Sequence, residues 1–519
     1  MLIYLSCMSK SSGKVVFKSY DPNQLSLLPP SLEELIPANH VVRVVQSVID
    51  QLDIEAILAN YKGGGTSSYH PRMLLKVIVY AYLSNIYSSR KIEDAVGANI
   101  HFMWLAGMQR PDHNTINRFR SDRLKGVLKE VFGQVVMLMV ESGLVDIKTI
   151  YVDGTKLEAN ANKYTFVWGK SLKRNKARIH EQLKGLWAYA ESVAAEELND
   201  NAPTTYEQID AEKVEQTIAS INEAIKDKPV DKKVKQKLNY AKREWPKKLR
   251  KYKQQEQQMG DRNSMSKTDP DATFMRMKDD HMRNGQLKAA YNWQISTSDQ
   301  YIVNYDLYQN PTDTLTLPKH LETYQQLYDE LPEVVVADAG YGSEENYELL
   351  EKAEVEAYIK YNYFHQEQKG KIKPKQAFHP KHLYYNQEED YYICPMGQRM
   401  ENKYETKTKK KSGYIQRASV YQAQRCQGCP LRGACHKSKE DRKIKVNRNL
   451  ERHKRKAREN LLSEQGLAHR SKRPADVEAV FGNIKQNKKF IRFHLRGLDK
   501  VQIGAGLVAL AHNLKKMAN

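Results

Sequence analysis

Two short apolar runs constrain the fold of this chain most. Ile150–Val152 and Val334–Ala337, rich in β-branched residues, each lead directly into an aspartate, Asp153 and Asp338, with a glycine close behind. Such runs are typical of buried strands, and Asp near Gly is typical of a turn. We therefore expect two neighbouring central strands of one sheet, each ending at a carboxylate. The alternative for each aspartate alone is an ordinary turn residue.

The pattern around these runs predicts an α/β fold. Strands are expected first as a meander and later in alternation with helices, which is typical of a mixed sheet. The expected strands are 149–153, 290–297, 301–308, 334–337 and 355–361, and the helices between them are 316–328 and 344–353.

The first 145 residues are expected to be helical. Apolar residues at helical spacing and a Ser31–Glu34 capping box predict helices at 31–36, 71–87, 90–96, 115–120 and 127–139. Short helices joined by polar turns, with Arg118 and Arg120 near one of them, fit a helix-turn-helix-like DNA reader. A helical bundle with solvated basic residues fits equally well.

The charge of the chain indicates a polyanionic partner. The 519 residues include 83 Lys and Arg against 62 Asp and Glu, a formal charge of +21. Such an excess favours nucleic acid binding. No apolar run approaches the roughly 20 residues that span a bilayer, and the apolar start is too short for a signal sequence. We expect a cytoplasmic protein, with Met1 or Met8 as its true start.

A long charged insertion is expected between the first two strands, at 170–258. Val214, Ile218, Ile221 and Ile225 recur at helical spacing, and residues 179–190 follow the same pattern. These amphipathic helices predict an αα-hairpin or coiled-coil arm. A solvated spacer, a dimerisation element and a DNA clamp all fit that arm.

Four of the five cysteines lie within one segment. Cys394, Cys426, Cys429 and Cys435 include a C-x2-C pair, and thiolates at such spacing bind tetrahedral Zn²⁺ in a reducing compartment. The sequence thus predicts a structural zinc site. Lysines between these cysteines, Lys409, Lys410 and Lys411, would present a basic loop to phosphates.

A third acid lies in a later helical segment. Pro474 suits the first turn of a helix that carries Glu478, with Arg473 beside it and Lys485 almost two turns further. Together with Asp153 and Asp338, Glu478 would supply hard oxygen ligands for Mg²⁺ or Mn²⁺. Two such ions suit phosphoryl transfer. The alternative is a solvated glutamate with basic neighbours.

Several strings along the chain resemble the bacterial insertion-sequence transposases of the DDE class, whose catalytic domain has a ribonuclease-H-like fold. The strings are Tyr20–Gln24, Leu28–Pro30, Tyr151–Lys156, Asp269–Ala272, Tyr291–Gln294, Ala337–Gly342, Val477–Lys485 and Ala511–Leu514. The resemblance implies that Asp153, Asp338 and Glu478 are the catalytic triad. It also implies that Arg473 and Lys485 contact the transposon end.

One part of the signature differs from related groups. They place an arginine four residues before the glutamate and a tyrosine before that arginine. Here Pro474 stands at the arginine position, Arg473 is one residue further away, and Ser471 stands where the tyrosine is expected.

The expected activity is Mg²⁺-dependent endonuclease cleavage at terminal inverted repeats, followed by strand transfer into target DNA by a homodimer in the bacterial nucleoid. A non-catalytic DNA-binding or repressor relative and a general nuclease are the alternatives. The expected domains are a DNA-binding region at 1–145, a catalytic core at 146–169 and 260–365, a helical insertion at 170–259, a zinc-binding insertion at 366–450, and C-terminal helices at 451–519.

Overall fold

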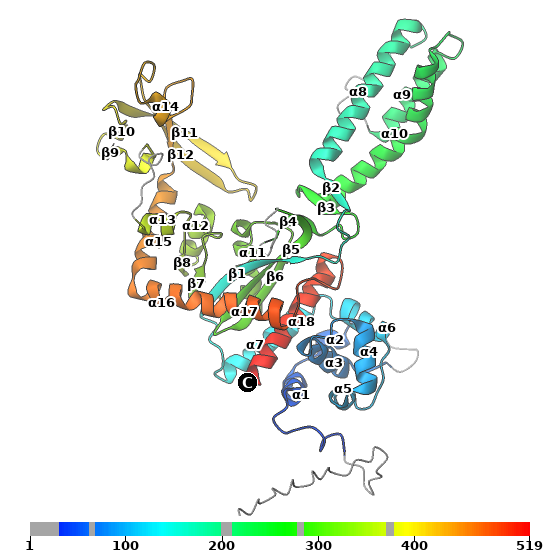
Figure 1. Cartoon of the computed structure of the whole chain (residues 1–519), viewed down its shortest axis with the longest axis vertical. Helices are drawn as coiled ribbons and strands as arrows, with labels where there is room; N and C mark the ends of the chain where they lie inside the picture. Colours follow the sequence, from blue (N-terminus) through cyan, green and yellow to red (C-terminus); the bar gives the residue numbers. More distant parts are fainter. Residues whose placement is uncertain (1–30, 62–67, 199–209, 278–284, 370–377, 519) are drawn as a thin grey trace, which may run out of the picture.

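A mixed six-stranded sheet forms the centre of the molecule (Figure 1). The computed structural model describes residues 31–61, 68–198, 210–277, 285–369 and 378–518. The strand order is β4-β5-β1-β7-β8, and β6 also pairs with β5. These strands are β1 (Thr149–Glu158), β4 (Thr273–Arg276), β5 (Leu287–Ser298), β6 (Tyr301–Tyr308), β7 (Val334–Ala337) and β8 (Glu356–Ile359). The α/β prediction is confirmed.

The two central strands bring the two aspartates together. β1 and β7 are parallel neighbours, with Val152 opposite Ala337. The next residue on each chain is the aspartate, Asp153 and Asp338, and neighbouring strands lie about 4.8 Å apart. The prediction that these residues lie on neighbouring central strands is confirmed.

The prediction that the first strand ends at Asp153 is wrong. β1 continues through Gly154 to Glu158, paired with β5 in an antiparallel register that sets Gly154 opposite Gln294. A Cβ at Gly154 would overlap the Gln294 side chain amide. The glycine is therefore required for this close approach, and it makes no turn.

Helices before and after the sheet share one hydrophobic core with it. The predicted helices at 71–87, 90–96, 115–120 and 127–139 are present with shifted ends, whereas 31–36 forms a turn in which the Glu34 N–H donates to Ser31 Oγ. The C-terminal helix α18 (Leu498–Met517) packs on α3, α7 and β6. The N-terminal helices are α1 (Val41–Gln51), α2 (Glu55–Leu58), α3 (Pro71–Leu83), α4 (Ser89–Ala98), α5 (Ile100–Leu105), α6 (His113–Arg118), a π-turn (Phe119–Arg123) and α7 (Leu128–Glu141).

Six further helices follow the meander. They are α11 (Leu317–Tyr328), α12 (Glu344–Lys352), α13 (Phe364–Gln368), α15 (Arg448–Leu462), α16 (Glu464–Arg473) and α17 (Ala479–Gly482). The predicted alternation is found in α11, β7, α12 and β8, whereas no strand separates α15, α16 and α17. Two π-turns, Pro474–Glu478 and Asn483–Asn487, flank α17, and short 3-10 turns lie at Asp313–Leu315 and Pro380–His382. None of the helices in the described ranges is long and apolar enough to cross a bilayer.

Two projections extend from this core (Figure 1). The insertion after β1 forms an arm of three helices, α8 (Gly169–Val193), α9 (Ala211–Ala224) and α10 (Lys232–Met259), with a hydrophobic core of its own. Its base is the small sheet of β2 (Phe166–Trp168) and β3 (Ser264–Ser266). An αα-hairpin was one expected form of this arm, and the third helix is an addition to it.

The second projection is a β-rich lobe. Its sheet has the order β13-β12-β11-β10-β9 and a small core of its own around Met400 and Tyr421. The elements are β9 (Tyr384–Asn386), β10 (Tyr391–Ile393), β11 (Arg399–Lys409), β12 (Ile415–Gln422), α14 (Arg432–Cys435) and β13 (Lys443–Val446).

Candidate active site

The buried residue Tyr341 lies within electrostatic range of both Asp153 and Asp338. The Tyr341 side chain is fully buried, and burial raises its pKa far above the ordinary value. The carboxylates of Asp313, Asp153 and Asp338 add to that rise, while Arg473 opposes it. These electrostatic effects require all four charged groups to surround the Tyr341 hydroxyl.

Arg473 links Glu478 to Asp153. Its Nη1 lies 2.7 Å from Glu478 Oε1, and its Nη2 lies 3.2 Å from Asp153 Oδ1. The side chain is 6% exposed in Arg473 and 11% in Asp153, against 52% in Glu478. A buried guanidinium therefore holds one carboxylate of the sheet and one of the C-terminal helices, while Glu478 remains open to solvent.

A π-turn explains how Arg473 reaches Glu478 across five residues. In an α-helix, side chains five residues apart point in directions about 140° apart. Here Pro474–Glu478 forms a π-turn, closed by the Ala479 N–H and the Pro474 carbonyl, which widens the turn by one residue. The extra residue in the sequence is thus absorbed, and Arg473 takes the place that a four-residue spacing would give.

The expectation that Pro474 starts the helix is wrong. The helical path begins at Glu464 in α16 and runs through Pro474, whose missing N–H falls at the π-turn. The apolar residues along this path, Val477, Val480, Phe481 and Ile484, are all buried.

Lys360, directly after β8, adds a second cation to the site. Burial lowers its pKa, and Arg473 and Arg470 lower it further, whereas Asp338 and Glu478 oppose that shift. Lys360 thus lies within electrostatic range of both carboxylates. The site thus combines carboxylates with three cations, Arg473, Arg470 and Lys360.

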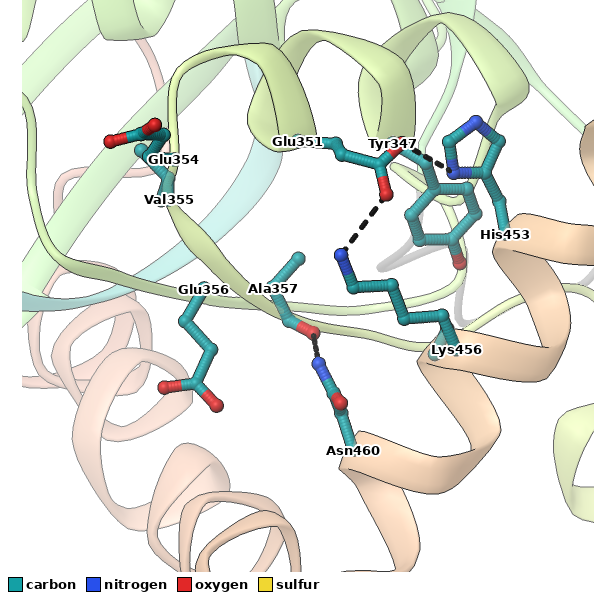
Figure 2. Close-up of a pocket in the computed structure, with 10 residues that line it drawn as sticks. Tyr347, Glu351, Glu354, Val355, Glu356, Ala357, His453, Lys456 and Asn460 are labelled. Atoms are coloured by element: carbon teal, nitrogen blue, oxygen red, sulfur yellow. Dashed lines mark hydrogen bonds and ion pairs between the residues drawn. The ribbon is translucent and has the colours of Figure 1, made fainter.

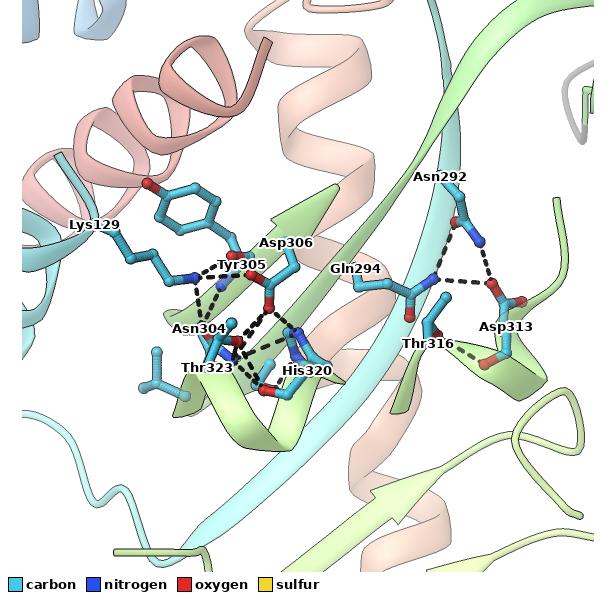
Figure 3. Close-up of polar contacts among 12 residues, drawn as sticks. Lys129, Asn292, Gln294, Asn304, Tyr305, Asp306, Asp313, Thr316, His320 and Thr323 are labelled. Carbon is cyan, nitrogen blue, oxygen red and sulfur yellow. Dashed lines mark hydrogen bonds and ion pairs between the residues drawn. The ribbon is translucent and has the colours of Figure 1, made fainter. Parts of the chain in front are cut away.

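Asp313 is a further acid that sequence reasoning missed. Its Oδ1 accepts hydrogen bonds from Asn292 Nδ2 at 2.8 Å and Gln294 Nε2 at 2.9 Å (Figure 3). Its Oδ2 and Asp338 Oδ1 both lie within 3.4 Å of the point where a Cβ at Gly340 would stand. Two amides at alternate positions of a buried strand were the available signal, because buried polar groups need partners.

Two family models match this chain. One, described as Transposase DDE domain, matches residues 393–518, and the other, described as Transposase domain (DUF772), matches residues 30–122. Both matches support an insertion-sequence DDE transposase. The first match includes Arg473 and Glu478, whereas Asp153 and Asp338 lie between the two matches. Comparisons with curated proteins and with solved structures found no match.

The zinc site expected in this transposase is not supported by its structure. Among the described residues, no three His, Cys, Asp or Glu side chains are arranged to hold a metal ion. Burial raises the pKa of the Cys435 thiol, and the thiols of Cys394 and Cys426 lie near enough to raise it further. Arg442 opposes this rise, and its Nη1 donates to Cys435 Sγ at 2.9 Å. Cys429 contacts Cys426 through a backbone hydrogen bond of 3.4 Å. Arg442 thus donates a hydrogen bond to one of the four sulfurs.

Among the described residues, Asp153, Asp338 and Glu478 are likewise not arranged as a group that holds a metal ion, and Arg473 pairs with two of them. Their chemistry nevertheless fits a hard divalent cation, because all donors are carboxylate oxygens. Arg473 Nε is also buried and has no hydrogen-bond partner among the described residues, so the site holds one unused donor.

The residues that were expected to contact DNA differ in their exposure to solvent. Arg118 is exposed, as are Lys409, Lys410 and Lys411 at the tip of the β11–β12 hairpin, and Lys485 is partly exposed in the second π-turn. Arg120 does not fit a DNA contact. It is 4% exposed, and its guanidinium donates to the Tyr87 carbonyl at 2.7 Å and to Asn117 Oδ1 at 3.2 Å. Arg120 thus stabilises the helices around it.

A second polar network lies deeper under the sheet (Figure 3). Ser296 Oγ lies 2.7 Å from His320 Nε2, and His320 Nδ1 lies 2.5 Å from Asp306 Oδ2. This order of groups resembles a hydrolytic triad, but Ser296 is fully buried. Lys129 from α7 completes the network at 3.3 Å from Asp306 Oδ1, so these residues join α7 and α11 to β6.

The cavity in Figure 2 is separate from the carboxylates. It has a volume of about 410 Å³ and lies between α12, β8 and α15. Two of its charged residues pair with each other, since Glu351 Oε1 lies 3.0 Å from Lys456 Nζ. None of Asp153, Asp338 and Glu478 lines it.

Proposed function

We propose that this transposase cleaves phosphodiester bonds at the terminal inverted repeats of its insertion sequence and joins the freed 3′-hydroxyl to target DNA. One observation carries the proposal: Asp153 and Asp338 directly follow the paired residues Val152 and Ala337 of two parallel strands, and Arg473 ties Glu478 to Asp153. This arrangement supports assigning the three carboxylates, which come from distant parts of the sequence, to one site.

The strand order supports a ribonuclease-H-like catalytic domain. An antiparallel meander of β1, β5 and β6 adjoins the parallel strands β7 and β8, with β1 in the centre. We assign this core to residues 146–169 and 260–365, with the DNA-binding helices at 1–145 before it, the insertions at 170–259 and 366–450, and C-terminal helices at 451–519 that carry Glu478.

Asp153, Asp338 and Glu478 are the residues that would hold two Mg²⁺ or Mn²⁺ ions. When bound, such ions lower the pKa of an attacking water and stabilise the leaving oxygen of the phosphodiester. The protein fixes Asp153 and Asp338 on a rigid sheet, so little reorganisation is needed at these two ligands.

The cations around the carboxylates would orient the DNA strand. Arg473 already uses Nη1 and Nη2 on Glu478 and Asp153, so its remaining N–H groups would donate to a phosphate oxygen while the two carboxylates keep the guanidinium in place. Lys360 and Arg470 add positive charge beside it. We assign further phosphate contacts to Lys485, Arg118 and the lysines at 409–411, in a homodimer that holds two transposon ends in the cytoplasm.

The proposal is tested by cleavage and joining of labelled DNA that carries the terminal repeats, with Mg²⁺. Asp153→Asn, Asp338→Asn and Glu478→Gln should each abolish nicking and strand transfer while DNA binding persists. Asp329→Asn is the matched control, because Asp329 is exposed and asparagine tolerates its left-handed backbone. Wild-type binding without cleavage would instead indicate a repressor, and cleavage of DNA without repeats would indicate a general nuclease.

A further inference from the structure

The charges of the arm are divided unevenly among its three helices. α10 has eleven lysine and arginine residues and two glutamates. α9 has one lysine and three glutamates, and α8 has six basic residues and two glutamates. A solvated helix pair usually mixes both signs, whereas a block of one sign indicates a charged partner.

One face of α10 is exposed and basic. Lys233, Lys237, Lys247 and Lys251 lie within roughly 80° of one another around the helix axis. All four are exposed, and they lie opposite the buried stripe that contains Leu238, Trp245 and Leu249. No ion pair with these lysines occurs in the described part of the arm, although neighbouring Arg250 pairs with Glu215 at 2.8 Å.

The arm is built to hold this face in a fixed place. Its core is filled by large side chains of all three helices, including Trp187 and Trp245. At its base, Leu172 and Met259 pack against Val167 and Met265 of the small sheet. A helix of 28 residues is about 42 Å long. That length corresponds to about 12 base pairs of duplex DNA.

We propose that α10 binds the phosphate backbone of duplex DNA beside the segment that reacts at the carboxylates. The inference rests on the proposed function, because it concerns how the DNA of that same site is held. The arm emerges from β1, the strand that carries Asp153, so DNA on the arm is adjacent to the catalytic core. Lysine side chains without base-reading partners bind backbone and read no sequence.

The test compares the salt dependence of DNA binding by the full chain. Fluorescence anisotropy with a labelled 40-base-pair duplex of arbitrary sequence, from 50 to 300 mM KCl, gives the slope of log K against log salt. The variant Lys237→Gln/Lys247→Gln/Lys251→Gln should lower that slope by about one unit for each lysine that contacts phosphate. Circular dichroism checks that this variant, the control variant described next and the wild type have the same helicity.

A control with the same charge change isolates the arm. Lys125, Lys148 and Lys352 are exposed lysines that already pair with Asp499, Glu333 and Glu348. Their triple change to glutamine should leave the slope unchanged. Equal slopes in all three proteins, or equal losses in both variants, would overturn the inference.

Two further outcomes are informative. Reduced self-association of the arm variant in sedimentation, with an unchanged DNA slope, would identify a second copy as the occupant and overturn the DNA inference. Wild-type protein that binds no DNA at 50 mM KCl would defeat the proposed function itself. If wild-type protein cleaves DNA but the three proteins have equal salt-dependence slopes, the proposed function would be supported and the proposed role of the arm would be wrong.

Discussion

Asp306 and Asp313 stand seven residues apart, and the protein treats their charges in opposite ways. Asp306 in β6 is matched inside the fold by Lys129, His320 and Thr323. Asp313 receives two neutral amides on one oxygen and faces Asp338 with the other. The first network compensates its charge completely, whereas the second adds negative charge to a site that already has three acids.

This difference distinguishes a carboxylate that supports the fold from one that is available to bind a ligand. A buried carboxylate that only supports the fold needs a permanent partner, since burial alone raises its pKa and disfavours the charge. In Asp306, Lys129 and His320 outweigh burial and hold the pKa below its ordinary value. An acid left without such a partner is available for a ligand. Four changes should sharpen or break this comparison.

The largest effect is expected at Lys129. Lys129→Met leaves Asp306 buried without its ammonium partner, which should lower the free energy of unfolding by about 3–5 kcal/mol. Urea denaturation followed by circular dichroism measures it. The double variant Lys129→Met/Asp306→Asn removes both charges and should recover most of that loss. A single variant as stable as wild type would show that Asp306 is not held by Lys129.

Arg473→Gln should affect catalysis more than folding. The neutral amide of Gln cannot form ion pairs with both Asp153 and Glu478, so repulsion between these two carboxylates should displace Glu478. A bound phosphate would also lose the positive charge of Arg473. We expect cleavage of end-labelled DNA to slow about 100-fold, as for loss of one oriented donor in other active sites. Arg473→Lys should restore the rate only in part, because lysine has one nitrogen where the guanidinium places Nη1 on Glu478 and Nη2 on Asp153. Full activity of either variant would place the phosphate contact elsewhere.

The sequence predicted the parts of this site that depend on local pattern. Two strands ending near aspartate, and a helical acid with an arginine close by, were visible as residue types. The sequence did not reveal that β1 continues past Asp153, because the partner that makes Gly154 necessary is Gln294, 140 residues away. The π-turn was equally hidden, since it compensates one extra residue by backbone geometry.

The fold was predicted where periodicity was strong, as in α3, α7, β5 and β6. It failed where tertiary contacts decided. Arg120 belonged by pattern to an exposed basic turn, but the carbonyl of Tyr87 and the side chain of Asn117 draw it inside. The cysteine cluster was predicted as a metal site from spacing, and among the described residues the structure shows no group arranged to hold a metal ion.

A smaller effect is expected at Asp313. Asp313→Asn keeps an oxygen that accepts from Asn292 and Gln294, and it removes one negative charge next to Asp338. Residues beside metal ligands typically change metal affinity by about 10–100-fold. We expect about a tenfold weaker binding of Mn²⁺, measured by electron paramagnetic resonance without DNA, and little change in stability. Unchanged Mn²⁺ binding would assign Asp313 to the fold, as for Asp306.

The smallest effect is expected at Glu351, which is matched as Asp306 is but lies near the surface. Arg452 and Lys456 lower its pKa from 4.5 to about 2. A depressed carboxylate pKa stabilises the fold above the unfolded pKa, and this stability is lost as pH falls from about 4.5 to 2. The side chain is 32% exposed, so solvent screening should keep the effect within about 1 kcal/mol. Glu351→Gln should therefore lower stability by up to that amount at pH 7 and cost nothing below about pH 2, which flattens the stability curve between pH 4.5 and 2. A loss of unfolding free energy as large as that of Lys129→Met would show that solvent exposure does not weaken an ion pair in this fold. The contrast between Asp306 and Asp313 would then depend on their charged partners alone and not on burial.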